Sequence, residues 1–299
     1  MTTALTATAA PAARGPRGLL WTVLRVHRTA LVFWALALIT ATAVLIWMYA
    51  IGDEARRGMS ACAEPVAVDG LPSCASVEAI TAVDTYRTYI ALIAAALSYA
   101  SFPVAAWAGG ALIGRELESG TARLAWTQSV SPTRWLAAKL AVPAALLTAG
   151  AGTIALLNLW TRQDDPSLVG DWYYPDAFIV TGPTVVAYPL AGLALGALAG
   201  LLLHRALPAA GLGFAAALVL YNVLERSRDD LWPTVTRVDE GGLELPRSAW
   251  QMHWDGETRA TFHPESHFWP LQYVETGILL AVAAAATLAA FQILRRRTP

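Results

Sequence analysis

A polar stretch between two long apolar segments, residues 114–139, holds the side chains with the clearest potential for chemistry. It carries two carboxylates, Glu116 and Glu118. A carboxylate forms strong charge-assisted hydrogen bonds with arginine or lysine. Two interpretations therefore stay open: the acids bind cations of a partner, or they pair internally with Arg115 and Arg123.

The order of residues in this stretch predicts a short helix between two longer ones. Ser119-Gly120-Thr121 ends one helix and begins the next, because Ser and Thr are preferred helix caps. Residues 121–128 then form a helix bearing Leu124 and Trp126, and Ser131-Pro132 supplies the cap and first-position proline of the following helix. Such a helix, lying parallel to a membrane, is either a rigid lever for a cytoplasmic partner or a plain amphipathic connector.

No other residue set points to catalysis or to a cofactor. The sequence has no phosphate-binding loop, no zinc-protease motif and no nucleophile elbow. Three histidines, His253, His263 and His267, permit a metal site, but no cysteine or carboxylate set completes a ligand shell. We therefore expect ordinary loop histidines, no metal, no cofactor and no enzymatic activity in this chain.

The composition indicates a membrane protein. Of 299 residues, 56% are hydrophobic and 14% charged, whereas soluble domains carry about 25% charged residues. Six runs of roughly 20 residues, the length that crosses a bilayer, have no charge except near an end. They cover residues 29–51, 88–113, 136–160, 184–203, 206–224 and 272–294. The sequence thus predicts an all-α integral membrane fold with six transmembrane helices.

The basic residues favour one orientation in the plasma membrane. The termini, the polar stretch and the His204-Arg205 turn hold 12 of the 21 basic residues but only two of the 22 acids. Positively charged short loops stay cytoplasmic, so both termini are predicted to be cytoplasmic. We expect residues 1–16 to be a disordered cytoplasmic tail, and residues 17–299 to form one six-helix membrane domain.

Other predictions concern the segments around the spans. An interfacial helix precedes the first span, although a plain extension of that span would give the same pattern. The segment from 225 to 271 is external and too irregular to assign. Cys62 and Cys74 share an external connection, where a disulfide is possible.

Three glycines at i, i+4 spacing predict close helix packing in the fourth span, within the chain or between protomers. They are Gly192, Gly196 and Gly200. Glycine at this spacing lets two helices approach closely in lipid.

The chain resembles the permease subunits of type 2 ABC exporters. The resemblance rests on Glu116, Glu118, Gly120-Thr121, Leu124, Pro132-Thr133-Arg134 and Lys139, together with the six-span layout. It implies two permeases, identical or homologous, that assemble with separate cytoplasmic ATPase chains. It also implies that Glu116, Glu118, Gly120, Thr121 and Leu124 form a coupling helix between the second and third spans that contacts the ATPase.

An alternative is a non-transporting membrane sensor or scaffold whose external segment reads a ligand. An ATPase encoded next to this chain would favour the transporter, and a histidine kinase the sensor. Neither interpretation involves nucleic acid. The Ala-, Gly- and Arg-rich composition, with a single lysine, is typical of a high-GC genome such as an actinobacterial one.

Overall fold

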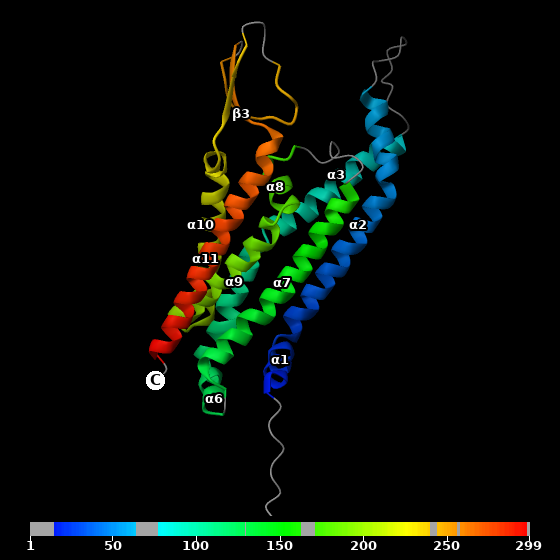
Figure 1. Ribbon diagram of the computed structural model, residues 1–299. Helices are drawn as coiled ribbons and strands as arrows, with labels where there is room; N and C mark the ends of the chain where they lie inside the picture. The colour runs from blue at the N-terminus through cyan, green and yellow to red at the C-terminus, as the bar shows by residue number, and fades with distance from the viewer. Residues whose placement is uncertain are drawn as a thin grey trace, which may run out of the picture.

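The computed structural model describes residues 15–63, 77–128, 130–162, 171–239, 244–255 and 258–297. They form an elongated bundle of helices with a small β-sheet at one end (Figure 1). Both ends of the described chain lie at the opposite end. We call these the sheet end and the terminal end.

Six segments are long and apolar enough to cross a membrane, which confirms the predicted six-span fold. They are Arg28–Arg57, Thr81–Glu118, Pro132–Thr161, Thr184–Leu203, Ala206–Arg226 and Glu265–Arg297. Their helices are α2 (Arg28–Ala63), α3 (Val77–Ser98), α4 (Ser101–Trp107), η1 (Ala108–Gly114), α5 (Arg115–Glu118), α7 (Pro132–Arg162), α9 (Thr184–Leu203), α10 (Ala206–Arg226), η4 (Glu265–His267) and α11 (Phe268–Arg297). The shorter elements between them are α1 (Gly15–Val26), α6 (Thr121–Thr127), α8 (Pro175–Thr181) and η3 (Arg228–Leu231).

Helix α1 is a separate element, divided from α2 by a turn at His27. Its two sides differ, because Val23 is buried while Trp21 and Arg25 are exposed. The Arg25 guanidinium lies 4.8 Å from the centre of the Trp21 ring. The helix packs against α7 and α2. Of the two interpretations of this segment, the structure therefore supports a distinct amphipathic helix.

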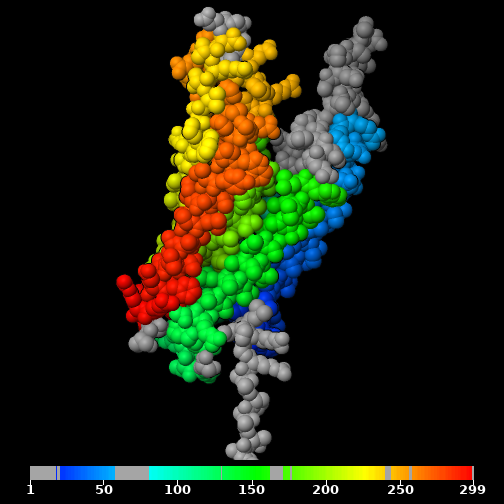
Figure 2. Space-filling view, in the orientation of Figure 1, coloured from blue at the N-terminus to red at the C-terminus, as the bar shows by residue number. Residues whose placement is uncertain are grey.

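Helix α9 forms the centre of the bundle. It is hydrophobic on all sides, as expected of a helix without a solvent-facing surface, and it packs against α4, η1, α7, α10 and α11. In the space-filling view, α11, α7 and α2 lie side by side in that order across the visible face (Figure 2).

The three spaced glycines of α9 face α4 and η1 of the same chain. A Cβ atom on Gly192 would lie 2.5 Å from the Ser101 carbonyl oxygen, and one on Gly200 would lie 2.7 Å from Ile113 Cβ. Gly196 meets the Ala105 carbonyl in the same way. The closest approach that these glycines permit is thus intramolecular.

The second span contains a π-helix, η1, that the sequence analysis did not predict. Its glycines lie against α10: a Cβ atom on Gly109 would lie 2.5 Å from the Ala209 carbonyl oxygen. Short π-helical turns inside longer helices are rare and occur frequently at functional sites. Here the π-helix leads directly into the polar stretch.

The sheet end holds a three-stranded antiparallel sheet within the segment that the sequence left unassigned. Its strands are β1 (Val235–Val238), β2 (Trp250–Trp254) and β3 (Arg259–His263), in the order β1-β3-β2. The register shifts between Gln251 and His253. The membrane-spanning part is therefore all helical, and the segment between α10 and α11 adds a small sheet.

A buried ion pair joins the sheet end to the bundle. The Arg228 guanidinium donates to both carboxylate oxygens of Glu275, at 2.8 and 3.1 Å. The Tyr188 hydroxyl donates to the same carboxylate at 2.6 Å, and Arg228 lies 4.3 Å from the centre of the Phe178 ring. These contacts tie η3, α9, α11 and α8 together. The bidentate geometry, with the Tyr188 hydroxyl as a further donor to the carboxylate, is the kind under which a buried charge pair is tolerated.

Two predictions lie outside the described residues. Cys62 belongs to the end of α2, but its side chain is not described, and Cys74 lies in the undescribed range 64–76. The disulfide therefore stays a prediction. The same holds for the disordered tail, of which residues 1–14 are not described.

Candidate functional site

The polar stretch folds as a helix, a sharp turn and a second helix at the terminal end of the bundle (Figure 1). Helix α5 ends at Glu118, and Gly120 has a φ of 74°, a left-handed conformation that glycine adopts without steric cost. Its carbonyl accepts from the backbone N–H of Leu124 at 3.2 Å, which starts α6. The predicted break and the predicted short helix are both present.

The following helix, α7, begins as its sequence predicts. Pro132 is its first residue, and the Ser131 hydroxyl accepts from the Arg134 backbone N–H at 3.4 Å. This cap satisfies one of the free N–H groups of the first turn.

Glu116 binds α7 rather than standing free. One of its carboxylate oxygens accepts from the Lys139 ammonium, and the other accepts from Trp135 Nε1 at 3.1 Å. Lys139 is 3% exposed, so Glu116 supplies the countercharge that a buried ammonium requires. The acid is thus paired internally, but not with Arg115 or Arg123.

His27 completes this cluster from the turn between α1 and α2. Its Nε2 lies 2.9 Å from Lys139 Nζ. Because an ammonium can only donate, Nε2 accepts, and the ring is neutral. Burial, then the nearby Lys139 charge, lowers the pKa of His27 from 6.5 to about 4, against an opposing effect of Glu116.

Glu118 binds a different helix. Its carboxylate accepts from the backbone N–H of Ala206, the first residue of α10, at 2.8 Å. The first N–H groups of a helix have no partner within it, and the positive end of its dipole favours an anion there. The two predicted acids therefore connect the polar stretch to α7 and to α10.

Helix α6 presents a mixed surface. Leu124 is 59% exposed, whereas Ala122 is buried. The Trp126 ring packs edge-on against Trp135 with 5.6 Å between ring centres. The Thr121 hydroxyl donates to the Glu116 carbonyl at 3.3 Å. Of the five predicted coupling residues, Leu124 is the one with a large exposed apolar side chain.

A pocket of about 1000 Å³ with a mixed lining of apolar and polar side chains lies beside these residues; we call it the mixed pocket. Its polar lining residues are Arg115, Glu116, Ser119, Thr121, Gln128, Lys139, Thr22, Thr29 and, from the turn between α1 and α2, His27. The rest of the lining is Trp135 and apolar side chains, among them Val26, Phe33, Trp107 and Val130. Sequence reasoning missed the roles of His27, Trp135 and Ala206. One signal for the Lys139 cluster was available in the sequence. Lys139 is the single lysine of the chain, and a buried lysine requires polar partners.

Two of the three histidines at the sheet end, His263 and His267, pair with each other. His263 Nδ1 lies 3.0 Å from His267 Nδ1, and His263 Nε2 lies 3.0 Å from the Asp229 carbonyl oxygen. Across the described ranges, no group of three or more metal-ligating side chains is found. His253 lies apart on β2.

A family model described as "ABC-2 membrane transporter related" matches residues 20–228. The matched region runs from α1 to the start of η3 and leaves out the sheet and α11. Neither the curated proteins nor the solved structures gave a match.

Proposed function

The chain belongs to the ABC-2 membrane transporter related family, and we propose that it is the transmembrane permease subunit of an ATP-driven exporter. It is a membrane component of an ABC transporter. The sequence carries no phosphate-binding loop, which supports an ATPase on a separate chain. Two permeases, identical or homologous, would then enclose the pathway.

The observation that carries this proposal is the attachment of the polar stretch to two spans. Glu116 holds it to α7 through Lys139 and Trp135, and Glu118 holds it to the start of α10. A push on α6 would reach both spans through charge-assisted bonds, which are stronger than neutral hydrogen bonds. A plain connector would need neither contact.

We propose three roles for the predicted coupling residues, which the contacts support. Glu116 and Glu118 transmit the displacement, and Gly120 permits the turn. Leu124, exposed on α6, is the side chain that meets the ATPase. We propose that closure of the ATPase pair moves α6, and that α7 and α10 then change the access of the pathway.

This role requires α6 to be cytoplasmic. The excess of arginine at the termini, in the polar stretch and at the α9–α10 turn supports that orientation. Both termini then also lie in the cytoplasm of a cell whose plasma membrane holds the protein.

Substituting Leu124 tests the proposal. The chain is co-expressed with its ATPase, and the amount of ATPase that copurifies is measured together with ATP-dependent export. We expect Leu124→Asp to lower copurified ATPase roughly tenfold, because a buried charge at an interface core is poorly tolerated. Val238→Asp is the matched control, since Val238 is 64% exposed on β1 at the sheet end.

Equal copurification and export in both variants would contradict the coupling role of α6. Intact wild-type protein that retains no ATPase under any condition would instead support a sensor or scaffold. Size-exclusion profiles of each variant separate loss of contact from loss of folding.

A further inference from the structure

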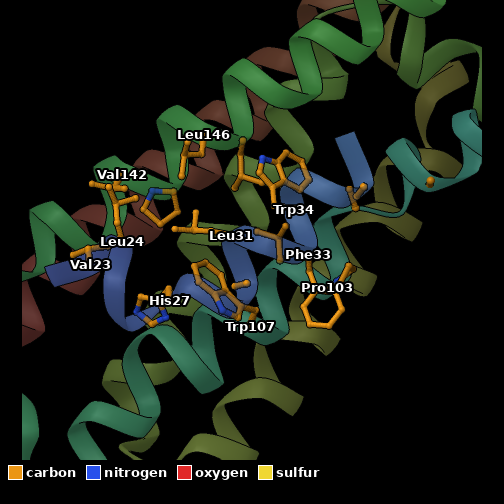
Figure 3. Close-up of a pocket in the computed structure, with 17 residues that line it drawn as sticks. Val23, Leu24, His27, Leu31, Phe33, Trp34, Pro103, Trp107, Val142 and Leu146 are labelled. Carbon is orange, nitrogen blue, oxygen red and sulfur yellow. The ribbon is translucent and has the colours of Figure 1, made fainter. Parts of the chain in front are cut away.

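An apolar pocket of about 490 Å³ lies between α1, α2, α3, α4 and α7 (Figure 3). Its volume falls within the range of small-molecule sites, about 300–1000 Å³. Leu31, Trp34, Val104, Trp107, Val142 and Leu146 form much of its wall. Apolar cavities of this kind bind apolar ligands rather than water.

The pocket follows from the residue types at its lining. Ala37, Ala96 and Ala100 stand where larger side chains would fill the space. Pro103 lines the pocket from α4, and Pro143 lines it from α7. Each lacks a backbone N–H and hinders tight regular packing. The pocket is also reachable from the side, because Phe33, one of its lining residues, is 69% exposed on α2.

The apolar pocket adjoins the mixed pocket of the candidate site. Both are lined by Val23, His27, Ala30, Phe33 and Trp107. His27 and Trp107 mark the junction, with their rings edge-on and 5.5 Å between centres (Figure 3). Together the two pockets form one space, with an apolar part that is open at Phe33, Ala37 and Ala96 and a mixed part, holding the charged side chains, at the terminal end.

The mixed part has an unmatched positive charge. Lys139 and Glu116 neutralise each other. Arg115 is exposed at the pocket, and no ion pair to it is found in the part of the chain that the structure describes. The Thr29 hydroxyl lines the same pocket, whereas the Thr22 hydroxyl already donates to the Gly18 carbonyl at 2.8 Å. Arginine and hydroxyl donors are the groups that bind phosphate.

We propose that this space binds one anionic phospholipid, with an acyl chain in the apolar pocket and its phosphate beside Arg115. The polarity gradient fits an amphiphile, and the unmatched arginine selects a negative head group. The second acyl chain lies along the exposed face of α2, the span with the smallest buried share. The site is independent of the proposed transport function, because it concerns a resident lipid.

Photocrosslinking in nanodiscs tests the site. The protein is reconstituted with a trace of phosphatidylglycerol that carries a diazirine in one chain, or with the matching phosphatidylcholine. Attachment sites are mapped by mass spectrometry. We expect labelling of Val104, Val142 and Leu146, and roughly tenfold more of it with phosphatidylglycerol, the effect of one charge-assisted contact.

Two pairs of variants make the result specific. Ala37→Phe fills the pocket and should abolish this labelling, while Ala35→Phe, on the same helix but outside the lining, should not. Arg115→Gln should remove the preference for phosphatidylglycerol, while Arg134→Gln should keep it. Ala96→Phe, which fills the pocket from α3, replaces Ala37→Phe if that variant elutes as an aggregate.

Equal labelling by the two lipids would overturn the anionic selectivity. Labelling of the three pocket residues that survives both filling variants would overturn the site itself, as would labelling confined to lipid-facing residues such as Leu156, which is 69% exposed. Each readout is lipid attachment, so a failure here leaves the coupling role of α6 untouched.

Discussion

At the scale of single residues, Lys139 organises the candidate site. It is the single lysine of the chain and is nearly inaccessible, so its charge needs compensation within the protein. Glu116 supplies it, and His27 accepts a further hydrogen bond from the same ammonium. The cluster therefore joins three elements: the α1–α2 turn, α5 and α7.

His27 should make stability depend on pH. Its pKa is lowered to about 4 in the folded chain, while an unfolded histidine titrates near 6.5. Between these values the unfolded state binds more protons, so the stabilising contribution is complete above pH 6.5 and is lost as the pH falls toward 4. Lys139 and Glu116 are the charged groups that face the ring.

We expect His27→Gln, which keeps an acceptor but does not titrate, to reduce this loss. The midpoint of thermal unfolding in detergent falls in both proteins when the pH is lowered from 7 to 4.5. We expect the fall to be roughly 2–4 °C smaller in the variant than in the wild type, which corresponds to about 1 kcal/mol at this chain length. Between pH 7 and pH 8 the unfolding midpoints of the two proteins should change in parallel. A constant difference over the whole range would mean that His27 acts through packing alone.

At the scale of elements, the sequence predicts what is encoded locally. Uncharged runs predict the six spans, and Ser119-Gly120-Thr121 and Ser131-Pro132 predict α6 and the start of α7. Neither η1 nor the sheet has such a signal. The π-helix η1 places its glycines against α10, a tertiary contact, and β1 pairs with β3 across 20 intervening residues. The partners of Glu116 and Glu118 were missed for the same reason, because each lies on another helix.

The glycine contact between α9 and α4 should be sensitive to a single methyl group. Gly192→Ala places a Cβ atom 2.5 Å from the Ser101 carbonyl oxygen, and the three nearest atoms all belong to the Ser101 backbone. We expect a loss of about 1–3 kcal/mol in stability, since overpacking forces the two helices apart. The measurement is thermal unfolding in detergent or chemical unfolding in mixed micelles.

Gly152→Ala in α7 is the control for this substitution. No atom outside its local backbone lies within 4 Å of the added Cβ. The change should be neutral or stabilise by up to about 1 kcal/mol, because alanine favours a helix more than glycine does. Equal effects of the two substitutions would show that the α4–α9 approach does not limit stability.

At the scale of the whole molecule, α10 connects the two ends. Its first residue, Ala206, binds Glu118 of the polar stretch, and Arg228, just beyond its last residue, forms the buried pair with Glu275. Helix α10 is thus fixed at the terminal end and at the sheet end. A displacement of α5 and α6 would reach the sheet end through one rigid element.

This route works only if the two ends lie on opposite sides of the membrane, with the terminal end inside. Single cysteines test that orientation after Cys62 and Cys74 are replaced by serine. Gln128→Cys marks the end of α6, and Gln251→Cys marks β2; both positions are exposed. A membrane-impermeant maleimide on intact cells should label position 251, and should label position 128 only after permeabilisation, because arginine-rich short loops are retained in the cytoplasm. Labelling of position 128 in intact cells would place α6 outside. No cytoplasmic ATPase could then reach Leu124, and the proposed coupling would fail together with the orientation.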